Sequence, residues 1–152
     1  MRELVRLLAD KGLKISCMES CTGGGVCNAI TNVEGASEVF EFGAVTYSNA
    51  FKVKLGVDAE VIERYSVYSE ETAKEMSRAV REFSRADIGI GVTGKLRRID
   101  KHNVYGDDDA VFISVFNGCN YYIAKLNVIY STREDNKKQI IQEIVNLIKR
   151  LI

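Results

Sequence analysis

A strand pattern that runs directly into three glycines places the strongest constraint on how this chain can fold. Apolar residues alternate with other residues from Leu13 to Met18, and the alternation ends at Ser20, just before the glycines Gly23–Gly25. This pattern predicts a β-strand that passes straight into the start of a helix, with Thr22 placed to cap that helix. Glycines here let a ligand approach backbone N–H groups at the positive end of the helix. The stretch is therefore either a tight turn or a site for anions and developing negative charge.

Composition and charge exclude several classes of protein. The chain has 152 residues, which is enough for one domain whose core needs neither a disulfide nor a metal. Its 21 basic and 21 acidic side chains cancel, which disfavours nucleic acid as a partner because such binding depends on clustered Lys and Arg. The sequence contains no 18-residue apolar window, and its amino terminus is typical of an amphipathic helix. We therefore expect a cytoplasmic protein without a membrane partner.

The cysteines do not follow a metal-binding pattern. Cys17, Cys21, Cys27 and Cys119 lack the paired C-x-x-C spacing of a zinc site, so we predict reduced, free thiols and no metal. Cys17 lies on an apolar strand face and is predicted to be buried. A redox function remains an alternative, and it would require a depressed thiol pKa that only Cys21, near the helix start, could have.

Apolar periodicity predicts a chain that alternates between helices and strands. Ser69 is predicted to cap a helix whose buried face includes Phe83, and Ser131 with Glu134 fits a capping box before the last helix. Asn117 and Gly118 predict the turn of an antiparallel hairpin. The predicted strands are residues 13–18, 39–47, 87–92, 110–116 and 121–129, and the predicted helices are residues 4–8, 26–31, 50–55, 59–64, 69–83 and 131–151.

This order predicts an α/β fold in one domain over residues 1–152, with a mixed sheet between helices that is parallel in its first half. Sheets of this kind bind ligands beyond the carboxyl ends of their strands. Ser20, Tyr47 and Thr93 follow three such ends, and they converge if the three strands are parallel neighbours. The glycines in residues 87–92 predict close approach of another backbone or of a ligand.

The available side chains restrict the chemistry of such a site. His102 is the only histidine and lies in a charged segment, so a Ser-His-Asp arrangement is disfavoured. The hydrolase motif G-x-S-x-G and the phosphate-binding motif G-x-x-x-x-G-K-[ST] are both absent. A serine can instead be activated by a buried lysine whose pKa is lowered toward neutrality. Ser20 and Lys52 are the candidates for that pair, although a solvated surface lysine is the alternative for Lys52.

Three ordered motifs resemble one known family. Glu19-Ser-Cys-Thr-Gly-Gly24, then Gly43-Ala-Val-Thr-Tyr-Ser-Asn49 with Lys52, then Gly91-Val-Thr-Gly94 are similar to the signature of the CinA carboxy-terminal domain family, the nicotinamide-nucleotide amidohydrolases. Arg133 resembles the arginine of the family's Gly-Asp-Arg segment, although Ser and Thr precede it here. The likeness extends over nearly the whole chain.

The resemblance implies a fold and a reaction. The fold is a three-layer α/β/α sandwich, and the reaction is hydrolysis of nicotinamide mononucleotide to nicotinate mononucleotide and ammonia, without metal or cofactor. It implies that Ser20 is the nucleophile, Lys52 the base and Tyr47 an assisting group. The residues expected at the substrate are Thr22, Gly23, Gly24, Asn49, Thr93 and Arg133, with the backbone of residues 22–24 donating to the oxyanion.

One segment departs from the family. After Gly94 the family has a small, glycine-rich loop, whereas residues 95–103 here are bulky and charged. Long side chains cannot adopt the backbone conformations of a glycine-rich loop without strain. This segment is either an anion clamp, in which Arg97, Arg98 and Lys101 bind a phosphate over the site, or a solvated loop whose positive charge the nearby aspartates offset. We expect weak or absent turnover by this chain alone. A non-catalytic relative that binds a nucleotide or a protein partner remains the alternative, and the sequence leaves open whether a homo-oligomer forms.

Overall fold

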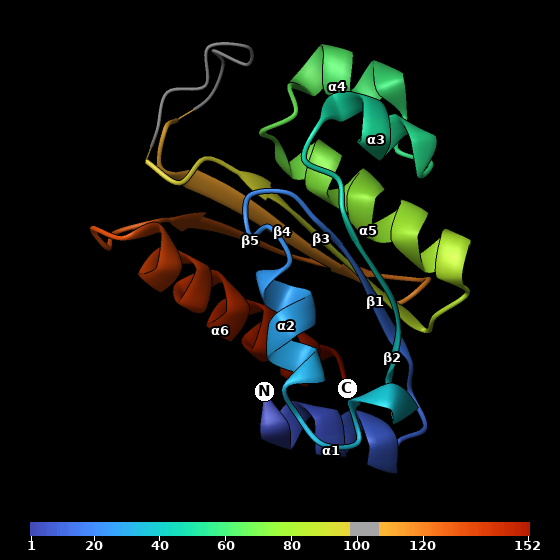
Figure 1. The fold of residues 1–152 in the computed structure, drawn as a ribbon. Helices are drawn as coiled ribbons and strands as arrows, with labels where there is room; N and C mark the ends of the chain where they lie inside the picture. The colour runs from blue at the N-terminus through green and yellow to red at the C-terminus, as the bar shows by residue number, and fades with distance from the viewer. Residues whose placement is uncertain (98–106) are drawn as a thin grey trace.

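The computed structural model describes residues 1–97 and 107–152, in which a five-stranded mixed sheet lies between helices (Figure 1). The helices are α1 (Arg2–Asp10), α2 (Gly25–Thr31), the short 3-10 helix η1 (Ala36–Glu38), α3 (Asn49–Lys54), α4 (Ala59–Tyr65), α5 (Glu70–Ser84) and α6 (Arg133–Leu151). The strands are β1 (Ile15–Glu19), β2 (Phe40–Val45), β3 (Ile88–Gly94), β4 (Ala110–Phe116) and β5 (Tyr121–Asn127).

The sheet order is β2-β1-β3-β4-β5. Strand β1 runs parallel to both of its neighbours, β2 and β3, whereas β4 and β5 complete the sheet as an antiparallel hairpin. The prediction of a mixed sheet that is parallel in its first half is therefore confirmed. The carboxyl ends of β1, β2 and β3 meet at one edge, as a ligand site in such a sheet requires.

Helices cover both faces of the sheet, which gives the predicted α/β/α sandwich (Figure 1). Helices α1, α2 and α6 enclose the larger core on one face, with Leu8, Val26 and Ile144 among its buried residues. Helix α5 covers the other face and packs Met76 against Met18 in a smaller core. All five residues of β1 are buried, so its alternating sequence does not mark one solvated face. Cys17, in this strand, is buried as predicted.

Two glycines allow α5 to lie directly on β3. A Cβ atom at Gly89 would overlap the carbonyl of Ser77, and one at Gly91 would overlap the carbonyl of Ala73. The predicted close approach at these glycines is therefore made by the backbone of α5. Because the helix lies in contact with bare backbone, a larger residue at Gly89 or Gly91 would force the two layers apart.

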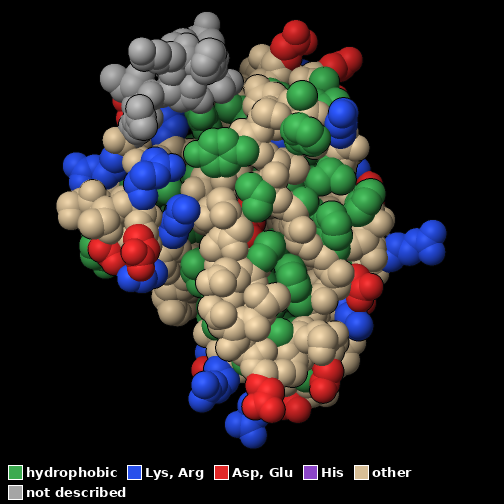
Figure 2. Space-filling view, in the orientation of Figure 1, with side chains coloured by type: hydrophobic (Ala, Val, Ile, Leu, Met, Phe, Trp, Pro, Cys, Tyr) green, Lys and Arg blue, Asp and Glu red, His purple; other side chains and the backbone are tan. Residues whose placement is uncertain are grey.

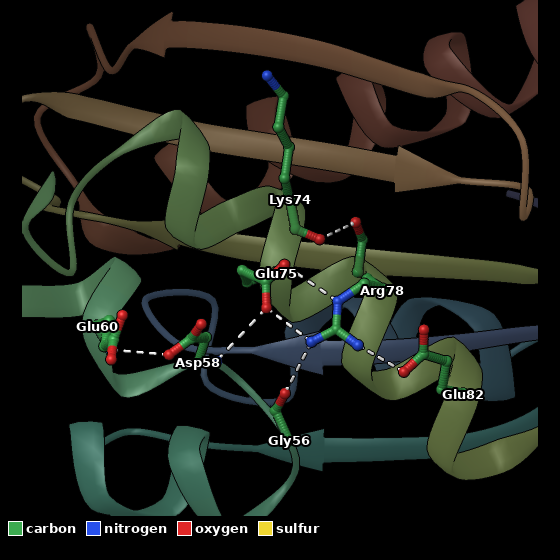
Figure 3. Close-up of polar contacts among 8 residues, drawn as sticks. Gly56, Asp58, Glu60, Lys74, Glu75, Arg78 and Glu82 are labelled. Atoms are coloured by element: carbon green, nitrogen blue, oxygen red, sulfur yellow. Dashed lines mark hydrogen bonds and ion pairs between the residues drawn. The ribbon is translucent and has the colours of Figure 1, made fainter. Parts of the chain in front are cut away.

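A charged network joins α5 to the connection between α3 and α4 (Figure 3). The Arg78 guanidinium pairs with Glu75 and Glu82 and also donates to the Gly56 carbonyl at 3.0 Å. The Glu75 carboxylate accepts from the Asp58 backbone N–H. Hydrogen bonding to Glu75 raises the pKa of Arg78 further above its usual range. The network thus positions the segment that carries α3, and with it Lys52.

Two local predictions are wrong. Phe83 is 60% exposed and contacts Phe42 at the surface, with ring centroids 5.0 Å apart, because the carboxyl end of α5 extends past the small core. The cap of α6 is Thr132, whose Oγ1 accepts from the Asp135 backbone N–H at 3.1 Å. The capping pair is therefore displaced by one residue from the predicted one. The hairpin turn and the Ser69 cap of α5 form where predicted.

No helix in the described part of the chain combines the length and the apolar character that a membrane span requires.

Candidate active site

Hydrogen bonds between neighbouring strand ends fix the position of Ser20. The Ser20 N–H donates to the Val92 carbonyl of β3 at 3.0 Å, and the Thr46 N–H donates to the Glu19 carbonyl of β1 at 2.8 Å. The three predicted strand ends are therefore adjacent. Ser20 itself is nearly buried in the central one.

Lys52 comes to this edge from helix α3. The helix begins after Ser48, whose side chain accepts from the Phe51 backbone N–H, and its first turns direct Lys52 inward. Lys52 Nζ lies 3.2 Å from Ser20 Oγ and donates to the Thr46 carbonyl at 2.7 Å. The side chain is 1% exposed, so the alternative of a solvated surface lysine is wrong.

Burial changes the protonation of this lysine. Removal from water disfavours the ammonium form and lowers the pKa of Lys52 from 10.5 to about 8. A substantial fraction of the side chain is consequently a neutral amine near pH 8. A neutral amine at hydrogen-bond distance from a serine hydroxyl can accept its proton.

Cys21 follows Ser20 and has the opposite character from a reactive thiol. Burial raises the pKa of Cys21 to about 12, although the nearby Arg133 and Lys52 charges oppose that shift. The expectation that Cys21 could carry a depressed thiol pKa is therefore wrong. Cys21 is therefore not a candidate for the redox function.

The Glu19 carboxylate organises the glycine turn. It accepts hydrogen bonds from the backbone N–H groups of Gly24, Val26 and Cys27, at 3.0, 3.0 and 2.8 Å. These are amides at the start of α2, so the negative group that this turn holds is a side chain of the protein itself. Sequence reasoning included Glu19 in a motif without assigning it this role.

Thr22 does not cap α2. The residue before the helix is Gly24, in the left-handed conformation with φ 91°, and the Thr22 hydroxyl is buried without a hydrogen-bond partner in the described part of the chain. Among the amides predicted to face an oxyanion, Gly23 N donates to the Ser20 carbonyl at 3.0 Å and Gly24 N donates to Glu19. Thr22 N is the member of this set that meets no acceptor within the described residues.

Three other predicted site residues lie near this edge in different environments. The Tyr47 side chain is 67% exposed, directly after the Thr46 carbonyl that Lys52 binds. Asn49 is the first residue of α3 and is half-buried. Thr93 is fully buried, and its hydroxyl donates to the Val67 carbonyl at 2.8 Å, which joins β3 to the segment before α5.

Cations gather where α6 begins, at the left edge of the face in Figure 2. Arg133, the first residue of α6, is exposed, and its Nη1 atom donates to the Leu96 carbonyl at 3.4 Å. Lys137, one turn further, has its Nζ atom 3.5 Å from the place where a side chain on Gly23 would begin. Sequence reasoning missed Lys137, because its proximity to the glycine turn arises only from the packing of α6.

The segment after Gly94 is described only in part. The Lys95 side chain is buried, pairs with Asp108 at 2.9 Å and lies over the Tyr68 ring. Arg97 Nη1 lies 3.5 and 3.4 Å from the carbonyl oxygens of Ile129 and Tyr130. The predictions for Arg98, Lys101 and His102 fall outside the described residues.

Within the described residues, one group of side chains has the composition of a metal site. The ligand atoms of Cys17, Glu19 and Cys27 all lie within 4.8 Å of one another. The Glu19 carboxylate in this group already accepts the three amide hydrogen bonds of the turn.

The fold and site define a class of α/β/α protein in which a buried serine–lysine pair lies at the carboxyl ends of parallel strands. The family model described as the CinA C-terminal domain matches residues 1–152. The chain belongs to this family, and the resemblance found in its motifs is confirmed.

Sequence relatives and solved structures agree with that assignment. A competence-damage inducible protein of Caldicellulosiruptor saccharolyticus is 52% identical over 92 residues, and a CinA-like protein of Kosmotoga olearia is 48% identical over 92 residues. Each alignment covers 60% of this chain and 22% of the relative, so the match spans about a fifth of those proteins.

The fold is similar to that of solved CinA superfamily proteins. A structure from Escherichia coli has a TM-score of 0.89 at 24% identity, covering 99% of this chain and 87% of that one. A competence/damage inducible protein from Agrobacterium tumefaciens has a TM-score of 0.85 at 26% identity, covering 99% and 94%.

Proposed function

We propose that this chain hydrolyses the carboxamide of nicotinamide mononucleotide to nicotinate mononucleotide and ammonia. The observation that carries the proposal is the buried contact between Ser20 Oγ and Lys52 Nζ, 3.2 Å apart. The resemblance of the three motifs to the nicotinamide-nucleotide amidohydrolases supports the choice of substrate. The names of the sequence relatives specify no reaction.

In the proposed reaction, Ser20 Oγ attacks the carboxamide carbon while the neutral Lys52 amine takes the hydroxyl proton. The lysine then gives that proton to the departing nitrogen, which leaves as ammonia, and the acyl group remains on Ser20 as an ester. A water molecule attacks this ester, Lys52 accepts its proton, and the proton returns to Ser20 as the acid product leaves. The Thr46 carbonyl binds one Lys52 N–H throughout, which keeps the amine directed toward the serine.

Charge develops on the carbonyl oxygen during both attacks and needs a hydrogen-bond donor. Of the predicted amides, those of Gly23 and Gly24 are engaged within the turn, so we assign the role to Thr22 N. The nucleotide phosphate needs a cation, and Arg133 and Lys137, which lie beside the turn at the start of α6, are our candidates.

A second candidate function is binding without turnover, of a nucleotide or of a protein partner. The observation that favours it is the internal use of groups expected to face a substrate: the Thr93 hydroxyl bonds to Val67, and two of three turn amides have protein acceptors. Loss of one oxyanion donor typically lowers the rate about 10²–10³-fold. A site with a single donor is therefore compatible with binding and very slow chemistry.

The test is ammonia release from nicotinamide mononucleotide, with nicotinate mononucleotide measured in parallel. Wild type is compared with Ser20→Ala and Lys52→Met, and the matched controls are Ser37→Ala and Lys54→Met, which change exposed residues of the same type. Turnover that disappears in the first two variants and persists in the controls supports the hydrolase. Calorimetric binding of the nucleotide without product supports the second candidate, and a chain that neither binds nor hydrolyses it contradicts both nucleotide proposals.

A further inference from the structure

Two thiols outside the Ser20 and Lys52 pair lie in direct contact. Cys17 Sγ, on strand β1, is 3.3 Å from Cys27 Sγ, in the first turn of α2. A disulfide has a sulfur–sulfur distance of about 2.05 Å, so closing a bond requires the two atoms to approach by about 1.3 Å. Rotation of the half-buried Cys27 side chain is the simplest route to such a movement, because Cys17 is fully enclosed.

The missing side chain of Gly43 creates the space for this contact. Gly43 of the edge strand β2 is paired in register with Cys17. A Cβ atom at Gly43 would overlap Cys27 Sγ and would lie 3.4 Å from Cys17 Sγ. Because Gly43 is itself exposed, the sulfur pair lies beneath a thin, solvent-facing part of the sheet edge.

A metal ion is the other ligand that two thiols and a carboxylate suggest, and the hydrogen bonding disfavours it. The Glu19 carboxylate would have to give up the amides of Gly24, Val26 and Cys27 in order to coordinate a metal. The two sulfurs alone fall short of the four ligands of a structural zinc site. A sulfur–sulfur bond leaves all three amide hydrogen bonds of Glu19 in place and removes only the long contact, 3.9 Å, that the Cys17 thiol donates to Glu19 Oε1.

We propose that Cys17 and Cys27 form a reversible disulfide when the protein meets a peroxide. The Cys27 thiolate attacks one peroxide oxygen, which breaks the oxygen–oxygen bond, releases an alcohol or water and leaves a sulfenic acid on Cys27. The Cys17 sulfur then attacks the Cys27 sulfur and displaces hydroxide, which leaves as water with the Cys17 proton. In sum, two thiols and one peroxide give one disulfide, one alcohol or water and one further water.

The environments of the two thiols assign their order. Cys27 is half-buried and can meet the oxidant, whereas Cys17 has no exposed surface. The hydrogen bond to Cys27, together with burial, raises the pKa of Cys17 well above its usual range. Cys17 is thus protected as a thiol until a sulfenic acid forms beside it. This inference is independent of the proposed hydrolase activity.

The test uses the full chain with Cys119→Ser, which removes the exposed thiol that could link two molecules. After a few equivalents of hydrogen peroxide, we expect the protein to lose the mass of two hydrogen atoms and two alkylatable thiols, and to regain both with dithiothreitol. Cleavage after Glu19 and Glu34 separates Cys17 from Cys27, so the disulfide appears as two linked peptides. The matched variants add Cys27→Ser or Cys21→Ser to this background.

The linked peptides should persist in Cys21→Ser and disappear in Cys27→Ser. Retention of the link in Cys27→Ser, or its loss in Cys21→Ser, would assign the bond to another pair and overturn the proposal. Oxidation of Cys27 to a sulfinic acid while Cys17 stays fully alkylatable would overturn it as well, because Cys17 would then not resolve the sulfenic acid. Circular dichroism of each variant verifies that the chain is folded before treatment.

Discussion

Lys52 Nζ lies 3.2 Å from Ser20 Oγ, although the two residues are 32 positions apart in the chain. Strand β1 delivers the serine, and the chain then passes through α2 and β2 before α3 returns the lysine to the same edge of the sheet. The parallel pairing of β1 with β2 makes this return necessary, since both strands must end at that edge. The contact therefore follows from sheet topology as much as from side-chain chemistry.

If Lys52 is the base, the rate should depend on its protonation. The pKa of Lys52 is about 8, so kcat/KM should rise as pH approaches 8 and level off above it. The measurement is a profile of nicotinamide mononucleotide hydrolysis from roughly pH 6 to 10, within the range where the chain remains folded. Lys54→Met should keep this profile, and a rate that is independent of pH across the range would exclude the assigned role.

The same pKa predicts a pH-dependent stability. Between about pH 8 and 10.5 the unfolded chain holds a proton on Lys52 that the folded chain has lost, so the free energy of unfolding rises with pH in this window. Relative to Lys52→Met, the free energy of unfolding of wild type should rise by about 3 kcal/mol across this window. Below the window, the difference between the two proteins should not change with pH. Urea unfolding of both proteins at several pH values measures the difference. A constant difference throughout would mean that the folded lysine keeps an ordinary pKa.

Glu19→Gln should destabilise the fold, although the side chain keeps nearly the same volume. One carboxylate oxygen becomes an NH₂ group that cannot accept a hydrogen bond, so at least one amide of the turn loses its partner, at a cost of about 2 kcal/mol. The matched control is Glu41→Gln on β2, where a half-exposed carboxylate pairs with Lys14 and the expected effect is below about 1 kcal/mol. Urea unfolding compares them, and equal losses would refute the special role of Glu19.

Gly91→Ala should force α5 away from β3. The new methyl group would overlap the Ala73 carbonyl, and relief of that overlap should lower the free energy of unfolding by about 2–3 kcal/mol. Gly25→Ala is the control, because its methyl group would meet no atom closer than 3.7 Å, at the Ile141 side chain. Thermal unfolding should separate the two variants clearly. An unchanged melting temperature in Gly91→Ala would show that the layers can move apart freely.

Turnover of nicotinamide mononucleotide by this chain alone should be weak or absent, because the segment after Gly94 is bulky and charged where the resemblance implies a small loop. The Arg97→Ala/Arg98→Ala double variant tests whether that segment binds the nucleotide phosphate. Robust, Ser20-dependent ammonia release by wild type would overturn the expectation of weak activity. If the double variant then loses this activity, the segment acts as an anion clamp, and if it retains it, the segment is a solvated loop.

Local sequence patterns predicted most helices and strands, because neighbouring residues determine where these elements begin and end. Periodicity predicts the strand just before Ser20, a hydroxyl predicts the Ser69 cap, and the absence of a side chain predicts the close approach at the glycines of β3. The small core ends before Phe83. Where it ends depends on the position of β2, which no local pattern predicts. Phe83 therefore fits the apolar stripe of α5 and still lies on the surface.

The cap of α6 illustrates a limit of motif reasoning. Ser131 with Glu134 and Thr132 with Asp135 fit the capping pattern equally well, and they differ by one residue. Asn136 decides between them, because its side-chain amide bonds both the N–H and the carbonyl of Tyr130 and fixes how the chain enters the helix. A tertiary contact thus selects one of two equivalent local solutions.

At the candidate site, the sequence indicated the serine and the lysine but not the group that shapes the turn. Glu19 was visible as a motif residue, yet its function requires the carboxylate to fold back onto amides five to eight positions later. Thr22 had the right chemistry for a cap and the wrong position, because left-handed Gly24 precedes the helix instead. Lys137 is separated from the motifs in sequence and joins them only through packing.

Helix α3 has one buried residue, Lys52, and α4 has none. The side chain proposed as the base is therefore also the one residue of α3 that is buried at the sheet edge, while the connection after α3 is held to α5 by Val57 and by the Arg78 network. When α3 detaches in a local opening, the base leaves with it, while Ser20 stays fixed between β2 and β3. Whether the site can react thus depends on the low free energy needed to open a surface helix locally. Hydrogen exchange of the α3 amides should report the loss of the contact between Ser20 and Lys52 under conditions where the core is still folded.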